Sequence, residues 1–117
     1  MQNKVEIALH GIDSVGAMKR YIEDQARGLN AIFEGIRGCM VLVEALPREA
    51  RKGAQFAVRL IVTLPGTEVV VNREHGEDPY VALHEAFEAA GFQLKDHLRR
   101  LDQVQRRARK DTPDSRS

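Results

Sequence analysis

The fold is decided by residues 77–110, which read EDPYVALHEAFEAAGFQLKDHLRRLDQVQRRARK. Asp78 is a favoured helix N-cap, and Pro79 suits the first helical position because its missing N–H would have no partner there. Apolar residues then recur at helical spacing and predict one stripe: Leu83, Phe87, Ala90, Leu94, Leu98 and Leu101. The sequence therefore predicts a long amphipathic helix whose apolar stripe must be buried against another element.

The second half of this helix is strongly basic. Between Lys95 and Lys110 there are seven Lys or Arg residues and two Asp residues, a net charge of +5. The whole chain carries +1 and the residues from Asp111 onward carry −1, which leaves −3 for residues 1–94. Basic residues also suit the C-terminal end of a helix dipole, so solubilising charge is the alternative to a binding surface. This charge asymmetry is the clearest indication of function in the composition.

Length and composition favour a small single-domain protein. The chain has 117 residues, of which 43% are hydrophobic and 30% are charged, as in ordinary soluble domains. No apolar run approaches the ~20 residues of a membrane span, and the N-terminus lacks the apolar region of a signal peptide. A single cysteine excludes an internal disulfide and indicates a reducing compartment. We therefore expect a cytoplasmic protein with one domain, residues 1–110, and a disordered polar tail, residues 111–117.

The chain before the long helix predicts four strands and one further helix. Alternating or continuous apolar residues indicate strands at residues 4–9, 39–46, 55–64 and 67–73. A helix capped by Asp13 or Ser14 would place these residues on one face: Met18, Ile22, Gln25 and Leu29. Pro65-Gly66 predicts a tight turn between the third and fourth strands. Residues 47–54 read as a loop with three basic residues, Arg48, Arg51 and Lys52.

The predicted order is β-α-β-β-β-α, which indicates an α+β fold. A four-stranded sheet with two helices packed on one face is the simplest arrangement that buries both helical stripes. The other face of the sheet would then be open to water. Its expected residues are only partly polar, because Glu6, Arg59 and Thr63 are joined by the apolar Ala8 and Ile61.

Motifs for catalysis, nucleotide binding and metal binding were sought without success. The chain has no P-loop, no GxGxxG after a strand and no GxSxG. The four histidines are far apart in sequence, and His84 and His97 are too distant along one helix to chelate one ion. Cys39 in an apolar strand is expected in the core rather than as a nucleophile. We therefore expect no enzymatic activity, no cofactor, no metal, no small-molecule substrate and no membrane association.

Several short motifs occur in a characteristic order along residues 4–101. They are Val5-Glu6-Ile7, Phe33-Glu34-x-Ile36, Leu64-Pro65-Gly66, Gly76-x-Asp78-x-Tyr80-x-Ala82-Leu83 and Gln93-Leu94. Each motif is weak alone, but their order and spacing form a fairly specific pattern. With these motifs, the chain resembles the ribosome hibernation-promoting factors, a family also called ribosome-associated inhibitor A, protein Y or sigma-54 modulation proteins.

The resemblance implies a fold and a function. Family members have a β-α-β-β-β-α fold related to double-stranded-RNA-binding domains. They bind the small ribosomal subunit where mRNA and tRNA would sit, and they silence translation in stationary phase or under stress. Long members add a domain that pairs ribosomes, so this chain resembles a short form. The resemblance and the basic stretch together imply rRNA contacts by both helices: Lys19, Arg20, Arg27, Lys95, Arg99, Arg100, Arg106 and Arg107.

The chain departs from the family at several helix positions that usually hold Lys or Arg. These positions hold Gly28, Ala89, Phe92 and Asp96. Fewer phosphate contacts would lower the affinity for rRNA and its dependence on salt. The alternative function is therefore a protein-interaction module of the same fold that has lost strong rRNA affinity.

Phe92 is the sharpest of these departures. At 100° per residue it lies about 160° from the centre of the apolar stripe, so we expect it to be exposed. As an exposed residue it would be plain surface, stack on an unpaired base or contact a protein partner. Weak self-association of the chain is left open by the sequence.

Overall fold

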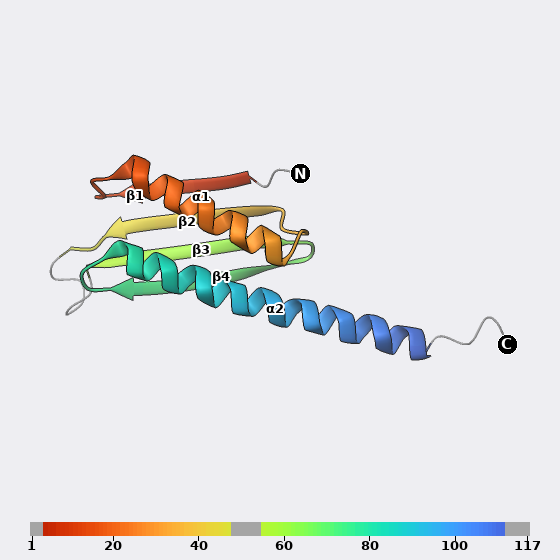
Figure 1. Cartoon of the computed structure of the whole chain (residues 1–117). Helices are drawn as coiled ribbons and strands as arrows, with labels where there is room; N and C mark the ends of the chain where they lie inside the picture. Colours follow the sequence, from red (N-terminus) through yellow and green to blue (C-terminus); the bar gives the residue numbers. More distant parts are fainter. Residues whose placement is uncertain (1–3, 48–54, 112–117) are drawn as a thin grey trace.

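The computed structural model describes residues 4–47 and 55–111, which form a four-stranded sheet with both helices on one face (Figure 1). The strands are β1 (Lys4–His10), β2 (Gly38–Ala45), β3 (Phe56–Leu64) and β4 (Thr67–His75), and the helices are α1 (Val15–Ile32) and α2 (Pro79–Asp111). The predicted fold class and element order are confirmed. The predicted loop residues Arg48, Arg51 and Lys52 and the tail after Asp111 lie outside the described residues.

The strands lie in the sheet in chain order, β1-β2-β3-β4. β1 pairs with β2 in parallel, and the other two pairs are antiparallel. Parallel neighbours need a crossover connection, which α1 supplies. β3 and β4 are joined by Pro65 and Gly66, and Gly66 has φ 76°, which glycine adopts without strain. The hairpin brings Val62 opposite Val69, so the inward residues of neighbouring strands form continuous rows.

The core lies between the inner face of the sheet and the two helices. The sheet contributes buried residues that alternate along β2, β3 and β4: Cys39, Val41, Val43, Val58, Leu60, Val62, Leu64, Val69 and Val71. The helices contribute Met18, Ile22, Ala26, Leu29, Ala82, Leu83, Ala86, Phe87, Ala90 and Leu94. The predicted face of α1 is confirmed apart from Gln25, which is half-buried beside the fully packed Ala26.

The start of α2 is fixed by a cap and by an aromatic pair. The backbone N–H of Tyr80 donates a hydrogen bond to Asp78 Oδ1 at 2.9 Å, which confirms the predicted cap. The half-buried ring of Tyr80 packs edge-to-face on Tyr21 of α1, with 5.2 Å between the ring centroids. The two helices are therefore held together at the end where α2 begins.

Farther along, α2 packs on α1 through Gly91. A Cβ added at Gly91 would lie 3.5 Å from Ile32 Cδ1 and 3.9 Å from Leu29 Cδ2. These are ordinary contact distances, so the close approach leaves room for alanine, although a mid-helix glycine costs about 1 kcal/mol relative to alanine.

The apolar stripe of α2 is longer than the sheet beneath it. Leu94 is fully buried, Leu98 is half-buried and Leu101 is 39% exposed. Figure 1 shows α2 continuing well past the β3–β4 hairpin. The sequence pattern assigns Leu101 to the same stripe, but its side chain is only partly covered. The buried part of α2 therefore ends near Leu98.

The two phenylalanines of α2 provide a matched test of this packing. Phe87 is 3% exposed and Phe92 is 65% exposed. Phe87→Ala should lower the free energy of unfolding by about 3–5 kcal/mol, because it removes a core aromatic ring. Phe92→Ala should change it by less than about 0.5 kcal/mol. Urea unfolding of both variants measures the difference, and similar losses in both would mean that α2 is rotated from the described orientation.

Candidate nucleic-acid interface

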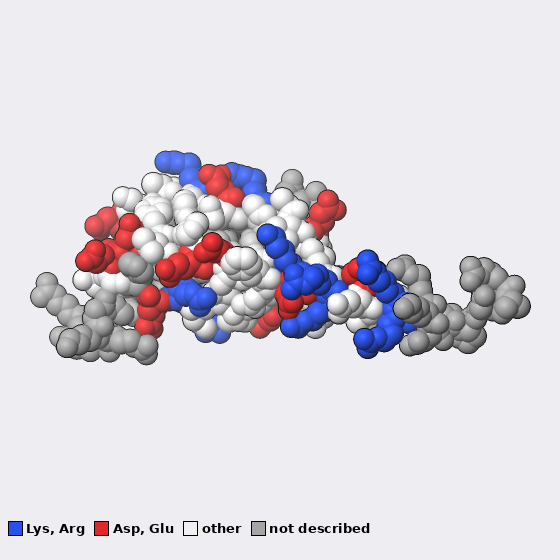
Figure 2. All heavy atoms as spheres, turned by 60° about the horizontal axis from the view of Figure 1, so that its bottom comes forward, with Lys and Arg blue, Asp and Glu red and all other residues white. Residues whose placement is uncertain are grey.

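The predicted cations lie on the surfaces of the two helices. All eight residues are exposed: Lys19, Arg20, Arg27, Lys95, Arg99, Arg100, Arg106 and Arg107. Figure 2 shows Lys and Arg gathered over the C-terminal half of α2, with many Asp and Glu residues toward the other end of the molecule. The charge asymmetry of the sequence is therefore also an asymmetry in space.

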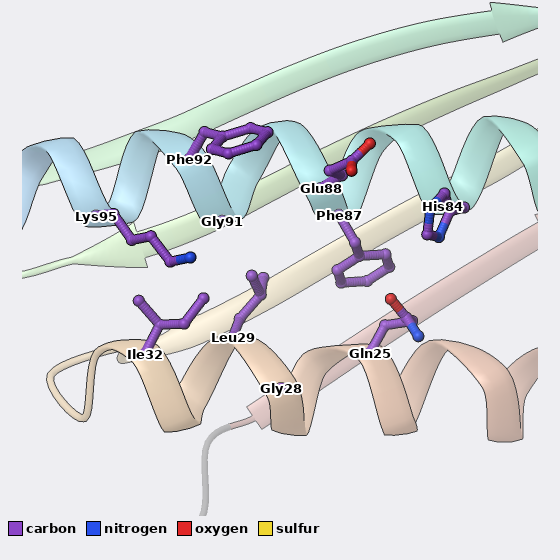
Figure 3. Close-up of a pocket in the computed structure, with 10 residues that line it drawn as sticks. All are labelled: Gln25, Gly28, Leu29, Ile32, His84, Phe87, Glu88, Gly91, Phe92 and Lys95. Atoms are coloured by element: carbon purple, nitrogen blue, oxygen red, sulfur yellow. The ribbon is translucent and has the colours of Figure 1, made fainter.

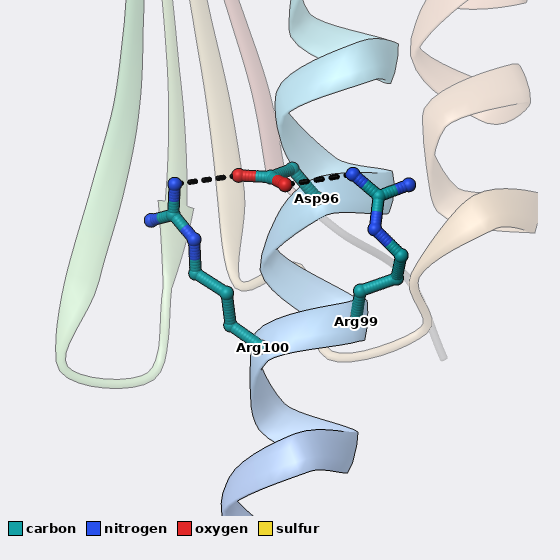
Figure 4. Close-up of polar contacts among 3 residues, drawn as sticks. All are labelled: Asp96, Arg99 and Arg100. Atoms are coloured by element: carbon teal, nitrogen blue, oxygen red, sulfur yellow. Dashed lines mark hydrogen bonds and ion pairs between the residues drawn. The ribbon is translucent and has the colours of Figure 1, made fainter.

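The helical phase divides the cations of α2 between two flanks. Gly91 marks the flank that faces α1, and Lys95, Arg99 and Arg106 lie between that flank and the outermost line of the helix. Arg100 and Arg107 lie on the opposite flank. In Figure 4, Arg99 lies on the side of α1, whereas Arg100 lies on the side of the β3–β4 hairpin. The cations of α2 therefore do not form one continuous row.

Half of the predicted cations form ion pairs with carboxylates. Asp96 lies between two arginines: its Oδ1 accepts a hydrogen bond from Arg99 Nη2 at 2.8 Å, and its Oδ2 is 2.6 Å from Arg100 Nη2 (Figure 4). Arg106 Nη2 lies 3.1 Å from Asp102 Oδ2, and Arg27 forms an ion pair with Asp24. Such exposed pairs stabilise the fold by at most about 1 kcal/mol, but they lower the local positive charge.

Four predicted cations have no carboxylate partner within the described residues: Lys19, Arg20, Lys95 and Arg107. They are also separated in space. Tyr21 and Gln25 mark the flank of α1 that faces α2, and Lys19 lies on the other flank. Arg20 lies near the outermost line of α1. The structure therefore places Arg20, Arg27, Lys95, Arg99 and Arg106 on the outward side of the helix layer, with Arg100 and Arg107 on its hairpin flank and Lys19 at its margin.

A groove of about 380 Å³ separates the two helices on this outward side (Figure 3). Its walls are Gln25, Gly28, Leu29 and Ile32 of α1 and His84, Phe87, Glu88, Gly91, Phe92 and Lys95 of α2. Phe92 lies at its rim and is 65% exposed, which confirms the predicted exposure. The Lys95 ammonium extends toward α1 (Figure 3). An exposed ring and a cation beside an open groove can contact a base and a phosphate respectively.

Sequence reasoning missed this groove. Gly28 and Gly91 lack side chains that could fill it, and a Cβ at Gly28 would meet no atom within 4 Å. The two glycines are far apart in sequence, so only the packing of α1 on α2 reveals that they line one groove. The sequence signal that could have indicated the groove is the presence of a glycine within each amphipathic helix, because a glycine leaves space on the helix surface.

The other candidates for chemistry are a buried thiol and histidines that lie apart. Cys39 is 7% exposed, and burial raises the pKa of its thiol from 9.0 to about 11, which confirms its predicted place in the core. His84 is exposed. The ring of His97 packs edge-to-face on Phe33, with 5.8 Å between the ring centroids. Among the described residues, no three His, Cys, Asp or Glu side chains are grouped to hold a metal ion. No described helix is long and apolar enough to cross a membrane.

Comparisons with known proteins agree with this architecture. The family model for "Sigma 54 modulation protein / S30EA ribosomal protein" matches residues 5–102. The solved N-terminal domain of Protein Y from Thermus thermophilus is similar over 82% of this chain and 99% of that domain, with 21% identity and a TM-score of 0.68. A ribosomal subunit interface protein from Coxiella burnetii is similar over 80% of this chain and 96% of that chain, with 17% identity and a TM-score of 0.65. A comparison with curated protein sequences gave no significant match.

Proposed function

The chain belongs to the sigma 54 modulation protein / S30EA ribosomal protein family, and from this premise we propose that it is a hibernation factor. It binds the small ribosomal subunit in the cytoplasm and keeps it from translating. The observation that carries the proposal is the family match over residues 5–102. The exposed cations on both helices support the choice of rRNA as the surface that is bound.

The outward side of the helix layer is the proposed contact surface. Arg20 and Arg27 of α1 lie on one side of the groove, and Lys95, Arg99 and Arg106 of α2 lie on the other. Arg100, on the hairpin flank of α2, extends this proposed surface (Figure 4). A guanidinium donates two parallel hydrogen bonds to a phosphate, which makes arginine well suited to the rRNA backbone. The groove between these cations offers Phe92 as a surface on which an unpaired base can stack. A protein held where mRNA and tRNA would sit, as the resemblance implies, excludes both from the subunit.

The affinity is expected to be lower than that of a family member with a full set of cations. The resemblance implies that Gly28, Ala89 and Phe92 stand where family members usually have Lys or Arg. Asp96 in addition pairs with two arginines and offsets one of their charges. Each phosphate contact that is lost reduces counterion release and therefore flattens the dependence of binding on salt. Binding should therefore depend on the few cations that remain.

A protein-interaction module is the second candidate. It is favoured by Phe92, because an aromatic side chain that is 65% exposed lies on this surface, at a position where the resemblance implies Lys or Arg. Cosedimentation of the purified chain with small subunits at low and high salt separates the two candidates. A chain that stays in the supernatant at both salt concentrations would favour the interaction module.

Arg99→Gln/Arg100→Gln tests the proposed surface. The double variant should lose most of its cosedimentation with small subunits, and the slope of log affinity against log salt should fall by roughly two. Thermal stability should change little, because both side chains are exposed. Lys4→Gln/Arg59→Gln is the matched control, since it removes the same charge from exposed residues of the sheet. Equal losses in both variants would mean that net charge, and not the helix surface, governs binding.

Asp96→Asn should increase the affinity for the small subunit. The substitution removes one negative charge and the carboxylate that pairs with both Arg99 and Arg100, so both guanidiniums become available to phosphates. Binding at several salt concentrations measures the effect, which should appear as tighter binding with a steeper salt dependence. Glu68→Gln removes an equal charge from the exposed face of β4 and should bind as the unmodified chain does. Unchanged or weaker binding by Asp96→Asn would exclude the arginine pair from the interface.

A further inference from the structure

The C-terminal part of α2 carries an apolar surface that no described helix or strand covers (Figure 1). We name residues 98–107 the α2 overhang, because the buried part of α2 ends near Leu98 and the helix continues past the β3–β4 hairpin (Figure 1). Leu98, Leu101 and Val104 share one face and continue the line of the core stripe. Leu101 is 39% exposed and Val104 is 62% exposed. Leu101 and Val104 therefore continue the apolar stripe of α2 where no described element packs against it, and such an exposed apolar surface suits contact with a partner.

The side of the sheet away from the helices is also apolar at its centre. We name it the outer sheet face. Strand register places Met40 opposite Ile61 and Ile61 opposite Val70, so these three side chains form one row across β2, β3 and β4. Met40 is 46% exposed. Hollows of about 380 and 260 Å³ open on this face, and no described element covers it (Figure 1).

The two surfaces carry opposite charge. The α2 overhang has four arginines and one aspartate, and Arg100 and Arg107 are the two that flank its apolar stripe. The outer sheet face has four carboxylates against two cations on its strands: Glu6, Glu44, Glu68 and Glu74 against Lys4 and Arg59. Two overhangs packed on each other would bring like charges together, whereas an overhang on an outer sheet face pairs opposite charges.

The dimensions also match. Ten helical residues span about 15 Å, and four strands at a spacing of about 4.8 Å are about 14 Å wide. An α2 overhang can therefore cross the whole outer sheet face. One such contact is small for a stable interface of about 1,200–2,000 Å². A reciprocal exchange, in which each copy places its overhang on the other, doubles the buried area.

From these features we propose that the chain self-associates, with the α2 overhang of one copy packed across the outer sheet face of a second copy. Leu101 and Val104 then contact the row of Met40, Ile61 and Val70, while the flanking arginines approach carboxylates at the edges of the face. The inference does not depend on the proposed function, since it concerns the purified chain alone. If both hold, self-association covers Arg100 and competes with ribosome binding.

Analytical ultracentrifugation of the full chain tests the proposal. The apparent mass should rise from monomer to dimer between micromolar and millimolar concentration. Val104→Glu and Met40→Glu should each weaken the association by about tenfold or more, because each places an unpaired charge in the contact. Both residues are exposed in the single chain, so the fold should be retained. Phe92→Glu, at a similarly exposed residue outside both surfaces, should associate as the unmodified chain does.

Mixing the two variants identifies the partner of each surface. Val104→Glu keeps an intact outer sheet face, and Met40→Glu keeps an intact overhang, so their mixture should associate more strongly than either variant alone. A monomer at every concentration would overturn the proposal. The proposal would also be overturned if Val104→Glu lost association while Met40→Glu associated as strongly as the unmodified chain. The overhangs would then pair with each other or with another surface.

Charge reversal on the two sides of the overhang gives a second matched comparison. Arg100→Glu/Arg107→Glu should weaken association, because these residues flank the apolar stripe. Arg99→Glu/Arg106→Glu makes the same change in net charge on the side away from the stripe, and it should have a much smaller effect. Equal effects of the two variants would exclude the proposed orientation of the overhang.

Discussion

The burial of the apolar stripe of α2 on the inner sheet face is the contact on which the rest of the structure depends. Leu83, Phe87 and Leu94 are almost completely buried, so α2 cannot rotate about its axis without exposing them. That fixed rotation turns Phe92, Lys95 and Arg99 outward. It also brings Gly91 against Leu29 and Ile32 of α1, which sets the width of the groove between the helices. The proposed rRNA surface is therefore a direct consequence of core packing.

Features that depend on local sequence could be predicted. The Asp78 cap, the Pro65-Gly66 turn and the alternation along β3 each depend on neighbouring residues, and all were confirmed. The exposure of Phe92 followed from helical phase alone. The presence of cations on the helix surfaces could be predicted in the same way, because exposed positions are the complement of the apolar stripe.

Features that depend on how distant elements meet could not be predicted. The exposure of Leu101 depends on where β3 and β4 end relative to α2, and a helical pattern contains no such information. The groove depends on Gly28 and Gly91 lining the same space from two helices. The division of the arginines around Asp96 depends on side-chain conformation in three dimensions. Each of these features changes the expected function: the first exposes a contact surface, the second provides a groove and the third reduces the positive charge.

The sheet thus separates two surfaces with different chemistry. The helix side combines cations with an exposed aromatic ring, which suits the proposed contact with rRNA. The outer sheet face combines an apolar row with carboxylates, which suits a protein surface better than a phosphate backbone. The α2 overhang would take part in both, because Arg100 belongs to the proposed rRNA surface and also flanks the apolar stripe of Leu101 and Val104. Ribosome binding and self-association are therefore expected to exclude one another.

Photo-crosslinking from the two sides of the sheet tests the orientation on the ribosome most directly. A photoreactive phenylalanine analogue is placed at Phe92 on the helix side or at Met40 on the outer sheet face, and each protein is irradiated with purified small subunits. Both positions are exposed, so the substitutions should leave the fold intact. Crosslinks to rRNA from position 92, with none from position 40, are the expected result. Crosslinks to rRNA from position 40, with none from position 92, would contradict the assignment of the helix side as the ribosome-binding surface.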